Sequence, residues 1–132
     1  MSDYTLVNFA EAEDMAAGHG LSPQLESRFL RTHLDSEHLG VSFFRVAPNF
    51  RTPFGHKHSV QEEAYVVVAG SGRVLLGEDV VELALWDVVR VAPDVQRAFE
   101  AGPDGMDLIA VGGPNPEGGD GVAGDLTWPD PA

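Results

Sequence analysis

The stretch that decides the fold is PFGHKHSVQEEAYVVVAGSG, residues 53–72, where two histidines one residue apart are followed by two glutamates. In a strand, alternate side chains share a face, so His56 and His58 should point together and Lys57 away from them. A hairpin-like return would bring the Glu63 carboxylate beside both imidazoles. Two imidazoles and a carboxylate can hold a divalent first-row metal and leave positions open for a ligand. A lone His-x-His pair is also common on exposed strands, so the metal prediction depends on Glu63.

Composition limits what this stretch can mean. With 132 residues, 43% of them hydrophobic, the chain is long enough for one compact domain with a core. No run approaches the roughly 18 apolar residues of a membrane span, and the first residues lack the basic opening and apolar core of a signal peptide. We therefore expect a soluble, cytoplasmic protein. Because there is no cysteine, any metal must be held by nitrogen and oxygen atoms.

Charge is unevenly distributed along the chain. The net charge of −13 opposes binding to nucleic acid or to an anionic membrane surface, so neither partner is expected. The eight basic residues all lie in the middle of the chain: Arg28, Arg31, Arg45, Arg51, Lys57, Arg73, Arg90 and Arg97. This middle part is therefore where an anion site should lie. Most of these side chains are expected to be solvated surface groups, with Arg97 as the exception.

Short apolar runs separated by Gly, Asp and Pro predict a mainly β structure, of the sandwich or barrel type. Residues 4–9 suggest a short strand and residues 10–17 a helix ending at Gly18. The glycine-rich residues 69–73 suggest a hairpin turn between two strands. Residues 113–132 are rich in Gly, Pro and Asp and should form an extended or flexible tail, from which Trp128 could dock on the barrel or on a neighbouring subunit.

The spacing of His56, His58, Glu63 and Gly70 resembles the first sequence motif of the cupins, His-x-His-x4-Glu-x6-Gly. The motif's earlier glycine is replaced by Phe50. The resemblance covers roughly residues 40–112 and implies an all-β double-stranded β-helix, or jelly-roll barrel, with a ligand cavity at one end. It also implies that residues 1–39 form an arm that packs on the barrel or is exchanged with a partner, so a homodimer is expected.

The second cupin motif, Gly-x5-Pro-x-Gly-x2-His-x3-Asn, is degenerate in this chain. Its five signature positions are taken, in order, by Trp86, Ala92, Asp94, Arg97 and Ala101. Arginine stays protonated and offers no lone pair, so Arg97 cannot replace the ligand histidine. At about 6 Å and an effective dielectric near 20, its repulsion of a dication is of order 5 kcal/mol.

Three arrangements remain open at this point. In the first, His56, His58 and Glu63 hold a metal and Arg97 orients an anionic ligand. In the second, Glu63 pairs with Arg97 and the cavity binds a small molecule without metal. In the third, the Gln96 amide supplies a fourth ligand to the metal.

The resemblance implies two classes of function. With nickel, zinc, iron or manganese bound, the chain would be an oxygenase, isomerase or decarboxylase acting on a small acid or sugar. Without metal, it would be a sugar-binding or small-molecule-binding module. Arg97, Gln96, Tyr65 and Phe99 are the predicted ligand-binding residues. Ser59 beside His58 is not expected to act as a nucleophile, because no aspartate is placed to orient the histidine.

Overall fold

The computed structural model describes residues 3–53, 55–114, 119–124 and 127–130. Almost all regular structure in these residues is β, and no helix among them is long and apolar enough to cross a membrane. The strands are β1 Leu25–Phe29, β2 Gly40–Val46, β3 Gly55–Lys57, β4 Glu63–Leu76, β5 Asp79–Leu83, β6 Val88–Val91, β7 Arg97–Gly112 and β8 Val122–Gly124. The predicted all-β class is confirmed.

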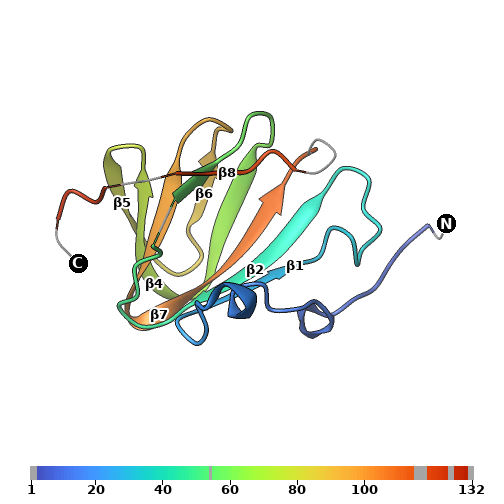
Figure 1. The fold of residues 1–132 in the computed structure, drawn as a ribbon, viewed down its shortest axis with the longest axis horizontal. Coiled ribbons are helices and arrows are strands. Elements are labelled where there is room, and N and C mark those ends of the chain that lie inside the picture. Colours follow the sequence, from blue (N-terminus) through green and yellow to red (C-terminus); the bar gives the residue numbers. More distant parts are fainter. Residues whose placement is uncertain (1–2, 54, 115–118, 125–126, 131–132) are drawn as a thin grey trace.

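The barrel is organised around β4 and β7, which pair antiparallel along almost their whole lengths (Figure 1). The second half of β7 also pairs with β2, which in turn pairs with β1. Arg97, the first residue of β7, pairs with His56 of β3, and β3 pairs with β8. β4 additionally pairs with β5 and β6. Each long strand therefore pairs with several other strands, and together they form one curled sheet.

The glycine-rich segment 69–73 lies inside β4 and is not the hairpin turn that its composition suggested. The pairing register between β4 and β7 shifts here, and Gly70 has a φ of 70°. A Cβ on Gly70 would lie 2.0 Å from the carbonyl oxygen of Gly105, so the close approach of the two strands requires glycine. Residues 69–73 therefore form a bend within one strand, whereas the sequence had suggested a turn between two strands.

The core fills the space inside the curled sheet. Its buried members come mainly from the two long strands and from β2, β5 and β6: Val46, Tyr65, Val67, Val74, Leu83, Val91, Phe99, Ala101, Met106, Leu108 and Ala110. Along the first part of β4, Tyr65 and Val67 are buried while the residues beside them are only partly so. This period of two is expected of a strand with one face toward the core.

The N-terminal segment packs on the barrel without forming the strand predicted at residues 4–9. It contains two single-turn 3-10 helices, η1 Phe9–Glu11 and η2 Ala17–His19, in place of the predicted helix over residues 10–17. The Phe9 ring packs against Phe43 of β2 with 5.5 Å between ring centroids. The Met15 amide donates to the Ser27 carbonyl at 2.8 Å. The segment is thus anchored by an aromatic contact and single hydrogen bonds, not by a strand ladder.

The C-terminal residues return to the barrel. Strand β8 pairs with β3, placing Ala123 opposite His56. Further on, the guanidinium carbons of Arg51 and Arg73 lie 4.4 and 5.4 Å from the centroid of the Trp128 ring. Cation–π contact of this kind holds the tryptophan on its own barrel, one of the two positions considered for it.

Candidate functional site

Three side chains of the first motif converge at one end of the barrel interior. His56 lies in β3, His58 follows that strand, and Glu63 begins β4. One potential ligand atom from each residue lies within 4.8 Å of the other two. The side chains of His58 and Glu63 are 9% and 14% exposed, and that of His56 is 34% exposed. The cluster is therefore compact and reaches solvent mainly through His56.

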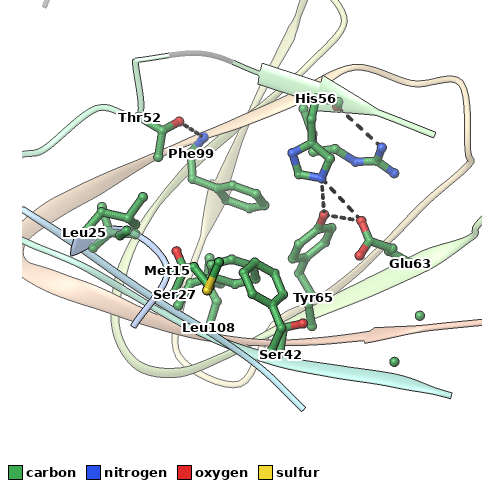
Figure 2. Close-up of a pocket in the computed structure, with 18 of the residues that line it drawn as sticks. Met15, Leu25, Ser27, Ser42, Thr52, His56, Glu63, Tyr65, Phe99 and Leu108 are labelled. Carbon is green, nitrogen blue, oxygen red and sulfur yellow. Dashed lines mark hydrogen bonds and ion pairs between the residues drawn. The ribbon is translucent and has the colours of Figure 1, made fainter. Parts of the chain in front are cut away.

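The Glu63 carboxylate is the centre of this cluster (Figure 2). Its Oε1 atom lies 3.1 Å from Nε2 of His58 and 3.5 Å from Nε2 of His56, and it accepts a hydrogen bond of 2.6 Å from the Tyr65 hydroxyl. The two imidazole rings meet edge to face, with centroids 5.2 Å apart. Two nitrogens and one carboxylate thus lie close enough together to hold a divalent first-row metal, for which they are a suitable donor set.

Asp120 is a site residue that the sequence-based reasoning missed. Its Oδ1 atom lies 2.7 Å from Nδ1 of His58, and its Oδ2 accepts hydrogen bonds from the amides of Val60 and Gln61 at 2.6 and 2.8 Å. The expectation that no aspartate orients His58 is therefore wrong. Ser59 still makes no catalytic triad, because its hydroxyl bonds to Asp120 at 3.4 Å. The only local signal in the sequence was the position of Asp120 between two glycines, of which Gly119 has a φ of 82°.

The pKa values of both carboxylates in the cluster are depressed. Burial raises the pKa of Glu63, but hydrogen bonds from His56 and Tyr65 and the charges of the two histidines outweigh it and lower that pKa to about 2. Burial also opposes ionisation of Asp120, but the amides of Gln61 and Val60 and the His58 ring hold its pKa well below the usual range. Burial and the nearby Glu63 charge raise the Tyr65 pKa, so the phenol remains a donor at neutral pH. The cluster therefore carries two carboxylates ready to compensate a cation.

Arg97 is completely buried and lies directly opposite His56 in the pairing of β3 with β7. Its guanidinium donates to three main-chain carbonyls, those of Ala92, Pro93 and His56, at 3.3 to 3.5 Å. Glu63 bonds instead to Tyr65 and His58, so the predicted Glu63–Arg97 pair is not formed. Arg97 lines the cavity, and of the two carboxylates considered as its partner, Glu63 is not the one that its guanidinium contacts.

The other predicted ligand-binding residues divide into two groups. Tyr65 and Phe99 both line the cavity, and their rings lie 4.9 Å apart between centroids. Gln96 does not line it, because its side chain lies against Gly124 of β8. A Cβ at Gly124 would be 2.4 Å from the amide nitrogen of Gln96. The arrangement in which Gln96 supplies a fourth ligand is therefore not the one observed.

A cavity of about 580 Å³ adjoins the cluster. Such a volume lies within the range of about 300–1,000 Å³ that is typical of small-molecule sites. Figure 2 shows His56, Glu63 and Tyr65 at one end of it, and Leu25, Met15 and Leu108 at the other. The cavity is most polar beside His56, His58 and Glu63 and mainly apolar at the other end, where Ser27 and Thr52 also line it.

The fold is shared with several solved structures. A cupin protein from Bacteroides fragilis superimposes with a TM-score of 0.70 at 20% sequence identity, over 100% of this chain and 98% of that one. A polyketide cyclase from Streptomyces resistomycificus matches with a TM-score of 0.66 at 20% identity, over 83% of this chain and 78% of that one. A variant of oxalate decarboxylase from Bacillus subtilis matches with a TM-score of 0.69 at 16% identity, over 83% of this chain but 30% of that longer one. The chain has the cupin fold.

The similarity to cupins was found by comparing structures and not by comparing sequences. No family sequence model matches the chain, and no curated protein sequence matches it significantly. At identities of 16 to 20%, the structural likeness confirms the jelly-roll architecture and leaves the chemistry to be argued from the site.

One backbone feature supports the register assigned to the degenerate second cupin motif. Trp86, which takes the position of that motif's first glycine, has a φ of 70°. This left-handed conformation is one that glycine adopts freely and that costs a bulky residue about 1–2 kcal/mol. The backbone at Trp86 therefore has a conformation that glycine favours, as the motif register would lead one to expect.

Proposed function

We propose that this cupin-fold chain binds a divalent metal ion through His56, His58 and Glu63 and takes a small organic ligand into the adjoining cavity. The observation that supports this proposal is the convergence of two imidazole nitrogens and one carboxylate oxygen within 4.8 Å. Nitrogen and oxygen donors of this kind suit nickel, zinc, iron or manganese. Because the protein would supply only three ligands, the metal would keep open coordination positions for a substrate oxygen.

The surrounding residues fit such an ion. Asp120 holds His58 by Nδ1, which turns Nε2 toward Glu63 and His56. Outer partners of this type orient metal-ligating histidines in many sites. The Tyr65 hydroxyl, 2.6 Å from Oε1 of Glu63, can position the carboxylate or donate to a bound ligand. A metal at this point would supply a Lewis acid to polarise a ligand oxygen.

If the chain is an enzyme, the reaction class would be that of a metal-dependent oxygenase, isomerase or decarboxylase. The similar structures include a decarboxylase and a cyclase, so the same barrel carries different reactions. The apolar lining contributed by residues such as Leu25 and Leu108 does not suit a sugar, which would need many polar partners.

A metal-free binding module is the second candidate, and Arg97 favours it. This buried cation stands where the family motif has a ligand histidine, directly across the strand pair from His56. Its charge opposes a dication nearby, and the low dielectric of a buried site strengthens that opposition. In this case the cavity would bind its ligand without catalysis.

Calorimetric titration separates the two candidates. Protein stripped with EDTA would be titrated with zinc, nickel, manganese and, without oxygen, ferrous ions. We expect one ion per chain for wild type and a loss of at least about tenfold in affinity for His58→Ala. The matched control is His33→Ala, an exposed histidine outside the cluster. Absence of binding, or equal losses in the two variants, would favour the metal-free module.

We also propose that the chain forms a homodimer through residues 1–39, which include β1 at one edge of the sheet. Tyr4 and Leu6 in the N-terminal segment are 84% and 92% exposed, which is unusual for large apolar side chains so close together. Light scattering at micromolar concentration should report twice the chain mass, and Leu6→Glu should shift it toward the mass of one chain. A monomer in wild type would contradict the dimer.

A further inference from the structure

The register of β2, β7 and β4 arranges the cavity in layers. Residues directly opposite each other on neighbouring strands project to the same face, so each row of partners forms one layer. The cluster of His56, His58 and Glu63 is called the metal-type cluster below. From this cluster inward, the rows are Gly40–Gly112–Glu63, Ser42–Ala110–Tyr65 and Phe44–Leu108–Val67. The first row, which contains Glu63, is the charged layer. The second row carries the hydroxyl groups of Ser42 and Tyr65, and the third row is the apolar layer.

A second cationic group besides Arg97, that of Arg31, lies against the charged layer. A Cβ on Gly40 would lie 2.6 Å from the NH2 nitrogen of Arg31 and 3.4 Å from its Nε, so the guanidinium occupies the space that a side chain at Gly40 would fill. The NH2 group donates to the Gly113 carbonyl at 2.9 Å. Because Gly40 shares a row with Glu63, Arg31 lies on the same face of the sheet as the metal-type cluster.

Arg31 differs from the other arginines in its partners. Five arginines lie within 4 Å of a carboxylate: Arg28, Arg45, Arg51, Arg73 and Arg90. Arg97 is bonded to three carbonyls. Among the residues that the structure describes, Arg31 contacts no carboxylate, although it is partly buried and lines the cavity of a chain with a net charge of −13. A guanidinium in this situation is suited to pair with a carboxylate from a ligand.

The apolar end of the cavity limits what else that ligand can be. Leu25 and Met15 approach it from β1 and the N-terminal segment, and Phe44, Leu108 and Phe99 line it from β2 and β7. Figure 2 shows Leu25, Met15 and Leu108 away from the His56 and Glu63 side chains. Gly40 and Phe44 are four residues apart on β2, so the charged and apolar layers are separated by about 13 Å. A short acid such as acetate would leave this apolar end unfilled.

We propose that the cavity binds an amphipathic monocarboxylic acid, with its carboxylate on Arg31 and its aliphatic or aromatic body against Phe44, Leu108 and Leu25. This inference deepens the proposed function, since it names the ligand class of the same cavity. It also replaces Arg97 by Arg31 as the residue that recognises the anion. The ligand extends away from Glu63 into the apolar layer and places its polar end beside the metal-type donors.

The test is calorimetric titration of EDTA-stripped and of zinc-treated protein with octanoate, 3-phenylpropanoate, acetate and 1-octanol. Octanoate and 3-phenylpropanoate should bind at least about tenfold more tightly than acetate, because each methylene removed from water favours binding about fourfold. Arg31→Gln should weaken octanoate about tenfold or more and leave 1-octanol unchanged, since only the acid loses a charge-assisted hydrogen bond. Arg31→Lys should recover part of the loss. Arg90→Gln, which removes an exposed arginine, is the matched control.

The outcomes separate this inference from the metal proposal. Octanoate binding that depends on Arg31 in stripped protein supports the inference even if no metal binds. Equal affinity for octanoate and acetate would overturn it, as would equal losses for octanoate and 1-octanol in Arg31→Gln. Unfolding curves of both arginine variants would show whether a loss reflects the fold, and a folded Arg31→Lys that binds no better than Arg31→Gln would also contradict the pairing.

Discussion

Nδ1 of His58 lies 2.7 Å from Oδ1 of Asp120, although 62 residues separate them in sequence. The low pKa of Asp120 keeps the carboxylate ionised at neutral pH, so it can only accept, and the histidine nitrogen must donate. The second oxygen is already used by the amides of Val60 and Gln61. The contact therefore determines which His58 nitrogen faces Glu63, and it joins the loop after β3 to the segment before β8.

Asp120→Asn should weaken metal binding about 10- to 100-fold, a range typical of partners that orient a ligand histidine. An asparagine has a single acceptor oxygen, so it cannot serve both His58 and the two amides. Calorimetric titration with zinc would measure the change. Asp104→Asn, at an exposed aspartate, should leave the affinity unchanged. Equal affinities for Asp120→Asn and wild type would show that His58 does not depend on this contact.

Replacement of Arg97 tests the effect of its buried charge. Arg97→Met removes the cation, and Arg97→His also offers a nitrogen opposite His56. We expect both to bind zinc and nickel more tightly than wild type, and Arg97→His more tightly than Arg97→Met. Both should lower the free energy of unfolding of the metal-free protein, because the carbonyls of Ala92, Pro93 and His56 lose their donor. Metal affinities that match wild type would mean that the Arg97 charge does not oppose the ion.

Stability of the metal-free protein should fall in acid because of Glu63. Its folded-state pKa is about 2, below the ordinary value of 4.5, so its contribution is present above pH 4.5 and is lost as the pH falls toward 2. A shift of this size corresponds to about 3 kcal/mol. Urea unfolding in EDTA across this range should show a shallower pH dependence for Glu63→Gln than for wild type. Glu78→Gln, at an exposed carboxylate, should follow wild type; parallel curves for all three proteins would exclude the Glu63 contribution.

Trp86 offers a test of the backbone register. Because its φ is 70° and its side chain is 66% exposed, glycine should suit the position better than alanine. We expect Trp86→Gly to exceed Trp86→Ala by about 1 kcal/mol in free energy of unfolding. At the neighbouring Leu85, alanine should instead be better than glycine, since glycine gains more freedom in the unfolded chain. The reverse order at Trp86 would mean that the turn is not strained.

Local patterns predicted an all-β sandwich or barrel and the core of its site, and the motif resemblance indicated the jelly-roll barrel. The parity of His56 and His58, and the short interval to Glu63, bring these three groups together through one strand and one connection. Alternation of apolar residues likewise predicts strands that curl around a core. The same patterns did not show that β4 is continuous, because Gly70 permits a bend as readily as a turn.

The contacts that refine the site depend on residues far apart in sequence. Asp120 reaches His58 because β8 pairs with β3, and Arg97 turns to main-chain carbonyls because the chain at Ala92 and Pro93 passes beside it. Arg31 enters the cavity because Gly40 has no side chain to exclude it. By itself the sequence determined which donor atoms share a strand face, since strand geometry repeats every two residues. Only the tertiary structure decided which partners those atoms and the two arginines meet, because such contacts are set by how distant segments pack and not by their spacing along the chain.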